Sequence, residues 1–383
     1  MENERTGTTR RGLLTPCGAL AIAMAVLIPL GMGPSRQAMG AAPGPVLPKM
    51  MDKSTVDAID KGLNYLAKTQ RPDGQWYPSG GYGSYPTAVT AIAGLALIAG
   101  GSTPESGPYA KNVRKAMFYF IRAAEADKDG LIATQSEGRS MHGHGFALLF
   151  LAQCYGMDLD EKTEKRLKNV LDRAVSVTQR SQSDNGPAVN HAGGWLYTPE
   201  SGGDEGSVTV TQLQALRACR NVGIKVNKAT IERAVAYLKC CQNADGGISY
   251  NYAGRGSGSR PPISAAAIAC FYAAGVYDRE SGGTGKEAEM VAKLIKFCQS
   301  HVNVEGGEVS GHYFYAHMYY AEAMYQRGGK DWETYYPKIR DKLINTQSPD
   351  GSWNGDSVGT TYGTGIACLI LQLPYGYLPI CQR

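Results

Sequence analysis

The chain has 383 residues, of which 43% are hydrophobic and 19% are charged, and its formal net charge is +5. These are the proportions of an ordinary globular protein rather than of a disordered or fibrous chain. So weak a positive charge gives no indication of a nucleic-acid partner, and we expect none.

The first residues predict a targeting segment over 1–40. Three arginines lie within the first eleven residues, an apolar run covers 17–30, and a small-x-small pattern typical of signal-peptidase cleavage stands at 38–40. Because the apolar run is short for a membrane span, we expect cleavage and export to the periplasm or the exterior. The alternative is an uncleaved anchor, which would make this segment the sole membrane contact. Residues 41–52, rich in Pro, Ala and Gly, are expected to be a linker.

A seven-residue motif then recurs near the start, the middle and the end of the chain. It reads QRPDGQW at 70–76, QNADGGI at 242–248 and QSPDGSW at 347–353. Together with a related Asp-Gly turn at 129–130, these motifs are separated by one or two units of about 55 residues. Such a period indicates an internal repeat and therefore a single domain, 53–383.

Each repeat has the same internal order. An amphipathic helix, such as IDKGLNYLAKTQ at 59–70, precedes a Gly/Asp turn and a second helix of small apolar residues, such as TAVTAIAGLALIAG at 87–100. The first helix is expected to bury one face, whereas the second is expected to be enclosed all round. Six such hairpins fit the chain, at about 59–101, 113–156, 167–223, 231–275, 288–329 and 336–380.

The first motif carries a family resemblance. Residues 61–76 read K-G-x-x-Y-L-x-x-x-Q-x-x-x-G-x-W, which resembles the QW repeat of squalene cyclases and other triterpene cyclases. The six-hairpin pattern is similar to that of the terpenoid cyclases and protein prenyltransferases over about 53–378. The resemblance implies an all-α fold, an (α/α)6 toroid of six helical hairpins in two concentric rings. It is marked in the first and last repeats and weak in the second, third and fifth, where Gly130, Trp195 and Gly307 mark the turns.

In that family the motif is structural, because its Gln and aromatic residue tie one outer helix to the next hairpin. The residue types agree: Asp-Gly forms a tight turn, Gln can satisfy free backbone donors at a neighbouring helix N-terminus, and Trp buries a large apolar surface. We therefore expect function at the ends of the inner helices that face the central cavity.

Polar residues just before or at the start of the inner helices are the candidates for catalysis. Repeat two offers MHGHGF, repeat three GGDEGS, and repeat five GHYFYAHMYY; the candidate residues are His142, His144, Asp204, Glu205, His312, Tyr315 and His317. Repeats two and three are neighbours, so His142, His144 and Asp204 are a candidate metal set, with zinc as the expected ion. Without a metal, the carboxylate and a histidine could form an acid–base pair.

The chemistry of the family is not found in the residues. The nearest strings to the Asp-rich DxDD motif of the cyclases are DLDE at 158–161 and DKDG at 127–130, and neither precedes an inner helix. The Asp-x-Cys zinc motif of prenyltransferases and the Cys-Gly-Glu-Gln of thioester toroids are missing. Whether the chain is an enzyme therefore stays open, and a transferase or isomerase activity would need other groups.

Three functions remain in order of expectation. The first is an exported cyclase- or prenyltransferase-like protein that binds a hydrophobic or isoprenoid small molecule in the central cavity. The second is a non-catalytic interaction scaffold, which a filled lumen would favour. The third is a carbohydrate-active enzyme similar to polysaccharide lyases, which would use His and Tyr as base and acid, with Arg255 or Arg260 neutralising a uronate.

Overall fold

The computed structural model describes residues 46–81, 85–134, 137–184, 193–254, 256–306 and 312–382. The expected signal segment, residues 41–45 of the linker and four residues noted above or in the mouths lie outside these ranges: Tyr82, His191, Arg255 and Gly307. The part from Leu47 onward forms one compact unit. Among the described residues, no helix is both long and apolar enough to cross a membrane.

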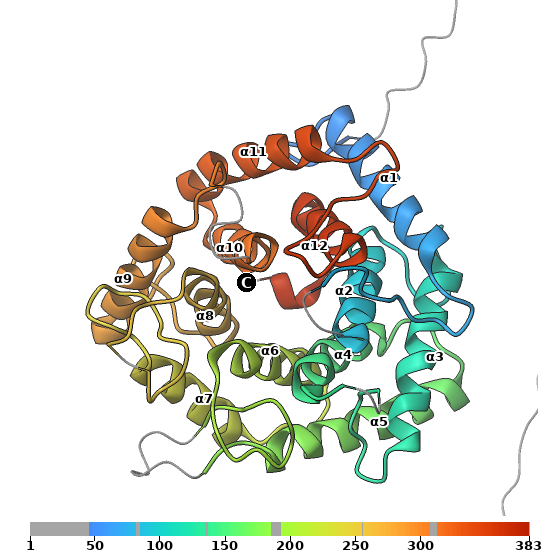
Figure 1. Ribbon diagram of the computed structural model, residues 1–383, viewed down its shortest axis with the longest axis horizontal. Coiled ribbons are helices and arrows are strands. Elements are labelled where there is room, and N and C mark those ends of the chain that lie inside the picture. The colour runs from blue at the N-terminus through green and yellow to red at the C-terminus, as the bar shows by residue number, and fades with distance from the viewer. Residues whose placement is uncertain are drawn as a thin grey trace, which may run out of the picture. The chain divides into compact units, whose positions relative to one another are not determined.

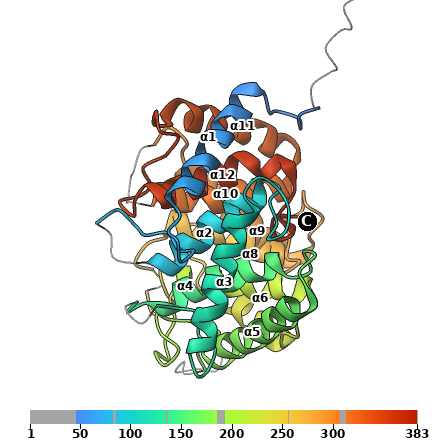
Figure 2. The same cartoon turned by 90° about the vertical axis from the view of Figure 1, so that its right-hand side faces the viewer.

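The compact unit confirms the predicted (α/α)6 toroid, with six outer and six inner helices in two concentric rings (Figure 1). The outer helices are α1 (Lys53–Thr69), α3 (Ala110–Ala126), α5 (Glu161–Arg180), α7 (Lys228–Cys240), α9 (Gly285–His301) and α11 (Gly329–Thr346). The inner helices are α2 (Pro86–Ala99), α4 (Ser140–Cys154), α6 (Gly206–Asn221), α8 (Pro261–Ala273), α10 (Tyr313–Arg327) and α12 (Thr360–Gln372). Two 3-10 turns, η2 (Leu373–Tyr375) and η3 (Pro379–Cys381), follow α12. The side view in Figure 2 shows the same two layers along the ring axis.

The two rings follow from the two kinds of helix in the sequence. An outer helix buries one face; α1, for example, buries Ile59, Leu63 and Leu66 while its charged residues stay in water. Every residue of α2 is buried, as its uniformly apolar sequence predicts. In the described residues extended backbone is limited to two isolated bridges, Trp195 with Glu205 and Gln242 with Ile248.

Close packing of the inner helices depends on glycine. A Cβ atom added at Gly94 would lie 2.5 Å from the Phe150 ring, and one added at Gly365 would lie 2.8 Å from Ile92. Both distances are shorter than carbon atoms tolerate, so α2 could not approach α4 and α12 as it does with larger residues there. Helix α12 packs on α2, and this contact closes the inner ring.

The recurring motif is structural, as predicted, but its glutamine acts in the opposite sense. Gln70 donates through Nε2 to the carbonyl oxygens of Gly74 and Asn112, each at 2.9 Å. It therefore satisfies an acceptor near the start of α3 rather than the free N–H groups that the sequence suggested. Trp76 is fully buried, and its Nε1 donates to the Leu66 carbonyl at 2.8 Å. Together they fix the turn between α1 and α2 against the next outer helix.

The eight described cysteines are all free thiols. Cys154, Cys219, Cys270 and Cys368 lie buried in the inner helices, as their apolar surroundings predict. The sequence also suggests a disulfide between Cys298 and the pair Cys240-Cys241, and the structure does not contain one. Burial alone holds the pKa of the Cys298 thiol far above its ordinary value.

Candidate functional site

His144 has a structural role inside the repeat. Its Nδ1 accepts the Ile132 N–H at 3.0 Å, and its Nε2 lies 3.2 Å from the Ala174 carbonyl and 3.1 Å from Thr178 Oγ1. Because Nδ1 accepts, the proton sits on Nε2, and the ring is neutral. Burial lowers the pKa of His144 to about 4. Both ring nitrogens are thus already used within the protein.

The same position in other repeats shows what His144 replaces. There the backbone N–H of the motif's last residue donates to a hydroxyl on the following inner helix: Trp76 to Thr90, Trp195 to Thr209, Ile248 to Ser264 and Trp353 to Thr364. In repeat two the acceptor is the His144 ring in place of a hydroxyl. A repeat-by-repeat alignment of these positions would have identified this role from the sequence.

His317 is also held by the fold. Its Nδ1 accepts the Tyr335 hydroxyl at 2.8 Å, and its Nε2 lies 3.4 Å from the Asn303 carbonyl. The ring packs against Tyr313 at a centroid distance of 4.2 Å. Burial lowers its pKa to about 4. The side chain thus links α10 to α11 through Tyr335 and does not lie in an open site.

Asp204 does not join the two histidines. Its Oδ2 accepts from the Tyr237 hydroxyl at 2.7 Å and from the Tyr252 N–H at 2.8 Å. These bonds direct the carboxylate toward α7 and the loop after it. Across the described ranges, no three His, Cys, Asp or Glu side chains are placed to hold a metal ion. The structure therefore does not assemble the set of His142, His144 and Asp204 that the sequence suggested for zinc.

His142 and Glu205 are brought together through one residue. Glu205 caps α6, because its carboxylate accepts the N–H groups of Ser207 and Val208. The Ser207 hydroxyl donates to Glu205 at 2.7 Å, and His142 Nε2 lies 2.9 Å from the same hydroxyl. Since that hydroxyl has a single proton, His142 donates from Nε2. Burial lowers the pKa of His142 to about 4 and raises that of Glu205.

Two arginines and two tyrosines lie beside this pair. Arg139 stands over the Tyr197 ring at 4.4 Å, and Arg260 lies 5.9 Å from the Tyr250 ring. The hydroxyls of Tyr197 and Tyr250 are hydrogen bonded to each other. These four residues, here called the Arg/Tyr row, cross the N-terminal ends of α4, α6 and α8. Within the described part of the chain, neither arginine forms an ion pair with a carboxylate.

The last two candidates open α10. His312 is half-buried, and burial and the charge of Arg260 lower its pKa. The Tyr315 N–H donates to Asp356 Oδ2 at 3.1 Å. Burial, with the charge of Glu205 nearby, raises the pKa of Tyr315 well above its ordinary value. Of the seven sequence candidates, His142, Glu205, His312 and Tyr315 therefore belong to one end of the lumen, whereas His144, His317 and Asp204 serve other contacts.

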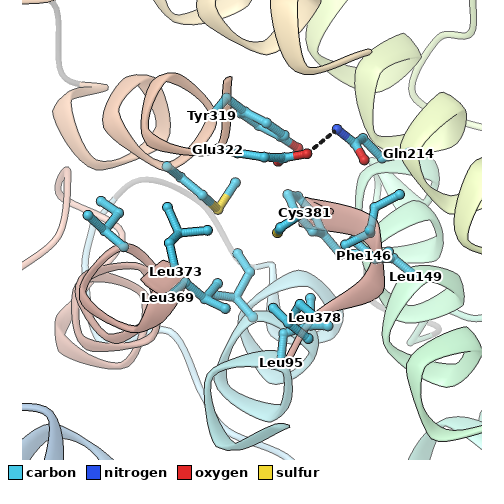
Figure 3. Close-up of a pocket in the computed structure, with 14 residues that line it drawn as sticks. Leu95, Phe146, Leu149, Gln214, Tyr319, Glu322, Leu369, Leu373, Leu378 and Cys381 are labelled. Carbon is cyan, nitrogen blue, oxygen red and sulfur yellow. Dashed lines mark hydrogen bonds between the residues drawn. The ribbon is translucent and has the colours of Figure 1, made fainter. Parts of the chain in front are cut away.

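A small cavity of about 50 Å³ lies within the lumen itself (Figure 3). Its walls come from five inner helices, α2, α4, α6, α10 and α12, and from the C-terminal turns. Most of the lining side chains are aliphatic or aromatic: Ile92, Leu95, Phe146, Leu149, Met318, Tyr319, Leu369, Ile370, Leu373, Leu378 and Ile380. The remaining three are Gln214, Glu322 and Cys381.

The C-terminal segment fills much of the lumen. After η2 the chain turns at Gly376, which has a φ of 69°, and enters the ring, so the end of the chain lies at the ring centre in Figure 1. Leu378 and Ile380 are buried there, and η3 packs on α6 and α10. Gln326 Nε2 donates to the Ile380 carbonyl at 3.3 Å. The residues 376–382 thus form a plug, and we use that name below.

One carboxylate lies in this apolar lumen. Glu322 is the single acid in the sequences of the six inner helices, and its Oε1 accepts from Gln214 Nε2 at 3.1 Å and from Gln326 Nε2 at 3.3 Å. Burial raises the pKa of Glu322 to about 8, although the bond from Gln214 acts in the other direction. The acid is therefore mostly protonated at neutral pH. The sequence analysis passed over Glu322, and its signal was a lone acid within an inner helix.

Comparison with known proteins gives the fold a wider setting. No protein-family model matches the chain, and no curated protein matches it. Solved structures do. The GH76A alpha-1,6-mannanase from Salegentibacter sp. HEL1_6 is 10% identical, with a TM-score of 0.61 over 84% of this chain and 99% of that one. The type II terpene cyclase MstE from Scytonema is 13% identical, with a TM-score of 0.54 over 84% of this chain and 97% of that one.

The chain is therefore an α/α toroid of the terpenoid cyclase-like kind at the level of fold. At these identities the similarity concerns the fold alone, and that fold carries both terpene and carbohydrate chemistry in its neighbours. The choice between such activities has to come from the side chains in and around this chain's own lumen.

Proposed function

We propose that this chain is an exported protein that binds an isoprenoid or similarly hydrophobic small molecule in the lumen of its helical ring. The observation that carries the proposal is the lining of the lumen, which is aliphatic or aromatic on all sides apart from Gln214, Glu322 and Cys381. Burying apolar surface there would contribute about 25 cal/mol per Å². The terpene cyclase with a similar fold has been solved with geranylgeranyl dihydroxybenzoate as its substrate, at a TM-score of 0.50.

Binding requires the plug to give way. A cavity of ~150 Å³ is what benzene needs in an engineered protein core. The lumen holds about 50 Å³, so an isoprenoid cannot enter while Leu378 and Ile380 occupy their places. The proposal is therefore one of binding coupled to movement of the C-terminus, and turnover would need catalytic groups other than those of the cyclases and prenyltransferases.

Native mass spectrometry of protein purified from its own host tests the proposal. We expect a population carrying an added mass in the range of a lipid, which organic extraction releases. Protein that stays free of ligand, both as purified and after incubation with isoprenoids, would favour the non-catalytic scaffold instead. Sequencing the N-terminus of the same material tests export: we expect a start near Ala41, and an intact Met1 would contradict it.

Carbohydrate chemistry is the second candidate, and the Arg/Tyr row beside His142 and Glu205 favours it, since stacked tyrosines and arginines suit sugars and their acids. A mannanase variant with two neighbouring aspartates replaced is described as inactive. This chain has no Asp-Asp pair, and its nearest equivalent in sequence, Asp204-Glu205, is engaged in structural hydrogen bonds. Titration with alpha-1,6-mannotriose and with oligouronates distinguishes the candidates, because a lumenal binder should ignore both.

A further inference from the structure

The polar groups of the lumen form an incomplete hydrogen-bonding set. Gln214 is 2% exposed, and its Oε1 has no hydrogen-bond partner among the described residues. Its Nε2 is occupied by Glu322 Oε1. Figure 3 shows the two side chains side by side at the cavity wall. A buried acceptor without a partner costs about 1–3 kcal/mol, so the site is built to receive a donor.

Glu322 supplies the complementary group. Its Oε1 accepts two hydrogen bonds, from Gln214 and Gln326, so a proton on the buried acid belongs on Oε2. The lumen then presents one O–H donor on α10 and one C=O acceptor on α6. A hydroxyl both donates and accepts, and it can satisfy the two groups together. The cavity is also large enough for water, which needs about 10–15 Å³ per molecule, and water can fill this place when no ligand is bound.

We propose that the lumen selects a long apolar alcohol, such as an isoprenoid alcohol, whose hydroxyl pairs with Gln214 and Glu322 while its chain takes the space now held by Leu378 and Ile380. This inference rests on the proposed function and names its ligand class. A plain hydrocarbon would leave Gln214 Oε1 without a partner and would displace the water as well, so it should bind more weakly.

The plug is suited to leave. Among the described residues, the bond from Gln326 to Ile380 is the single hydrogen bond that joins residues 376–382 to the ring helices; the others are local turns. The segment ends the chain, so its removal breaks no later connection. Gly376 adopts a positive φ that most residues avoid, and it marks the point at which the backbone can change direction. The plug thus holds the lumen by apolar contact, which an apolar ligand can replace.

The test compares two ligands that differ by one oxygen. Farnesol and the same C15 chain without its hydroxyl are titrated by calorimetry into the full mature protein and into the double variant L378A/I380A, which shortens the plug. We expect the double variant to bind farnesol more tightly than the wild type does. In that variant farnesol should bind on the order of tenfold more tightly than the hydrocarbon, the usual value of one hydrogen bond with a buried acceptor.

Variants of the polar pair assign the effect to its atoms. In the L378A/I380A background, Q214L should abolish the preference for the alcohol, and Q214M gives a second version should the first fail to fold. E322Q keeps both a donor and an acceptor and should retain the preference. The matched control is Q153L, since Gln153 is also a buried inner-helix glutamine with a partnerless Oε1 but does not line the cavity.

Each outcome has one meaning. Equal binding of alcohol and hydrocarbon overturns the alcohol site and leaves the hydrophobic ligand of the proposed function in place. Failure of the folded double variant to bind either ligand overturns both. A preference that survives both Gln214 variants, or that Q153L removes, overturns the assignment to Gln214 and Glu322.

Discussion

The side-chain amide of Gln347 donates a 2.9 Å hydrogen bond to the carbonyl oxygen of Ala58, 289 residues earlier in the chain. The bond joins the turn after α11 to α1, and thereby the last repeat to the first. Gln70, Gln182 and Gln242 form the same bond to the next outer helix, at Asn112, Thr230 and Met290. The ring is therefore closed by the same interaction that links its successive repeats.

Loss of the closing contact should destabilise the whole ring. Trp353 is buried, and its Nε1 donates to the Leu343 carbonyl at 2.8 Å. We expect Trp353→Ala to lower the free energy of unfolding by roughly 3–5 kcal/mol, as for buried aromatic residues generally. Trp76→Ala should cost a similar amount, and Gln347→Ala about 1–3 kcal/mol. Denaturant titration measures all three, with the exposed Gln299→Ala as the control. A Trp76 variant with an unchanged melting temperature and lost ligand binding would show that the motif is a ligand loop.

His144 and His142 should separate in their effects. His144→Ala removes the acceptor of the Ile132 N–H and leaves a buried cavity, so we expect a loss of about 2–4 kcal/mol. His142 has one hydrogen bond, to Ser207, and His142→Ala should cost less, about 0.5–1.5 kcal/mol. Thermal unfolding of both variants checks the order. The reverse order would mean that His142, not His144, is the structural residue.

Glu322 should leave a signature in the pH dependence of stability. Burial raises its pKa from 4.5 to about 8, so the folded protein holds a proton that the unfolded chain releases. Its contribution is full below pH 4.5 and is lost as the pH rises through 8. Nearby Cys270, Tyr319 and Cys381 have pKa values raised well above their ordinary values by burial, so they stay neutral in this window.

The measurement is denaturant unfolding of wild type and Glu322→Gln between pH 4.5 and pH 8. We expect the stability of the wild type, relative to the variant, to fall with a slope of up to about 1.4 kcal/mol per pH unit. Burial lowers the pKa of His144 and His317 to about 4, so both proteins also lose stability as the pH falls below 6.5. That effect cancels in the comparison. Parallel curves would mean that Glu322 is ionised in the folded protein.

Shortening the plug should open the lumen without unfolding the ring. Leu378→Ala and Ile380→Ala each remove a buried side chain, and we expect each to cost about 2–5 kcal/mol while increasing binding of an environment-sensitive apolar dye. Tyr377→Ala is the control, because Tyr377 is 55% exposed and points away from the core. Dye binding that rises equally in the control would indicate general loosening rather than an opened lumen.

The sequence by itself determined the ring. The period of about 55 residues, the amphipathic and the fully apolar helices, and the recurring Gln and Trp predict six hairpins in two layers, and the structure confirms them. This succeeds because each repeat carries its own local pattern and contacts its neighbours, so short-range information specifies the fold. The expectation that the motif is structural followed from the same residues.

The tertiary structure alone decided which polar residues share a site. His142 and Glu205 meet because α4 and α6 are adjacent, whereas His144, four residues from the start of α4, faces Ile132 and α5. Sequence position cannot give these directions, because a shift of one residue turns a helical side chain by about 100°. The entry of residues 376–382 into the lumen depends on packing against α6 and α10, which are remote in the chain. Only that packing sets Glu322 and Gln214 beside the plug.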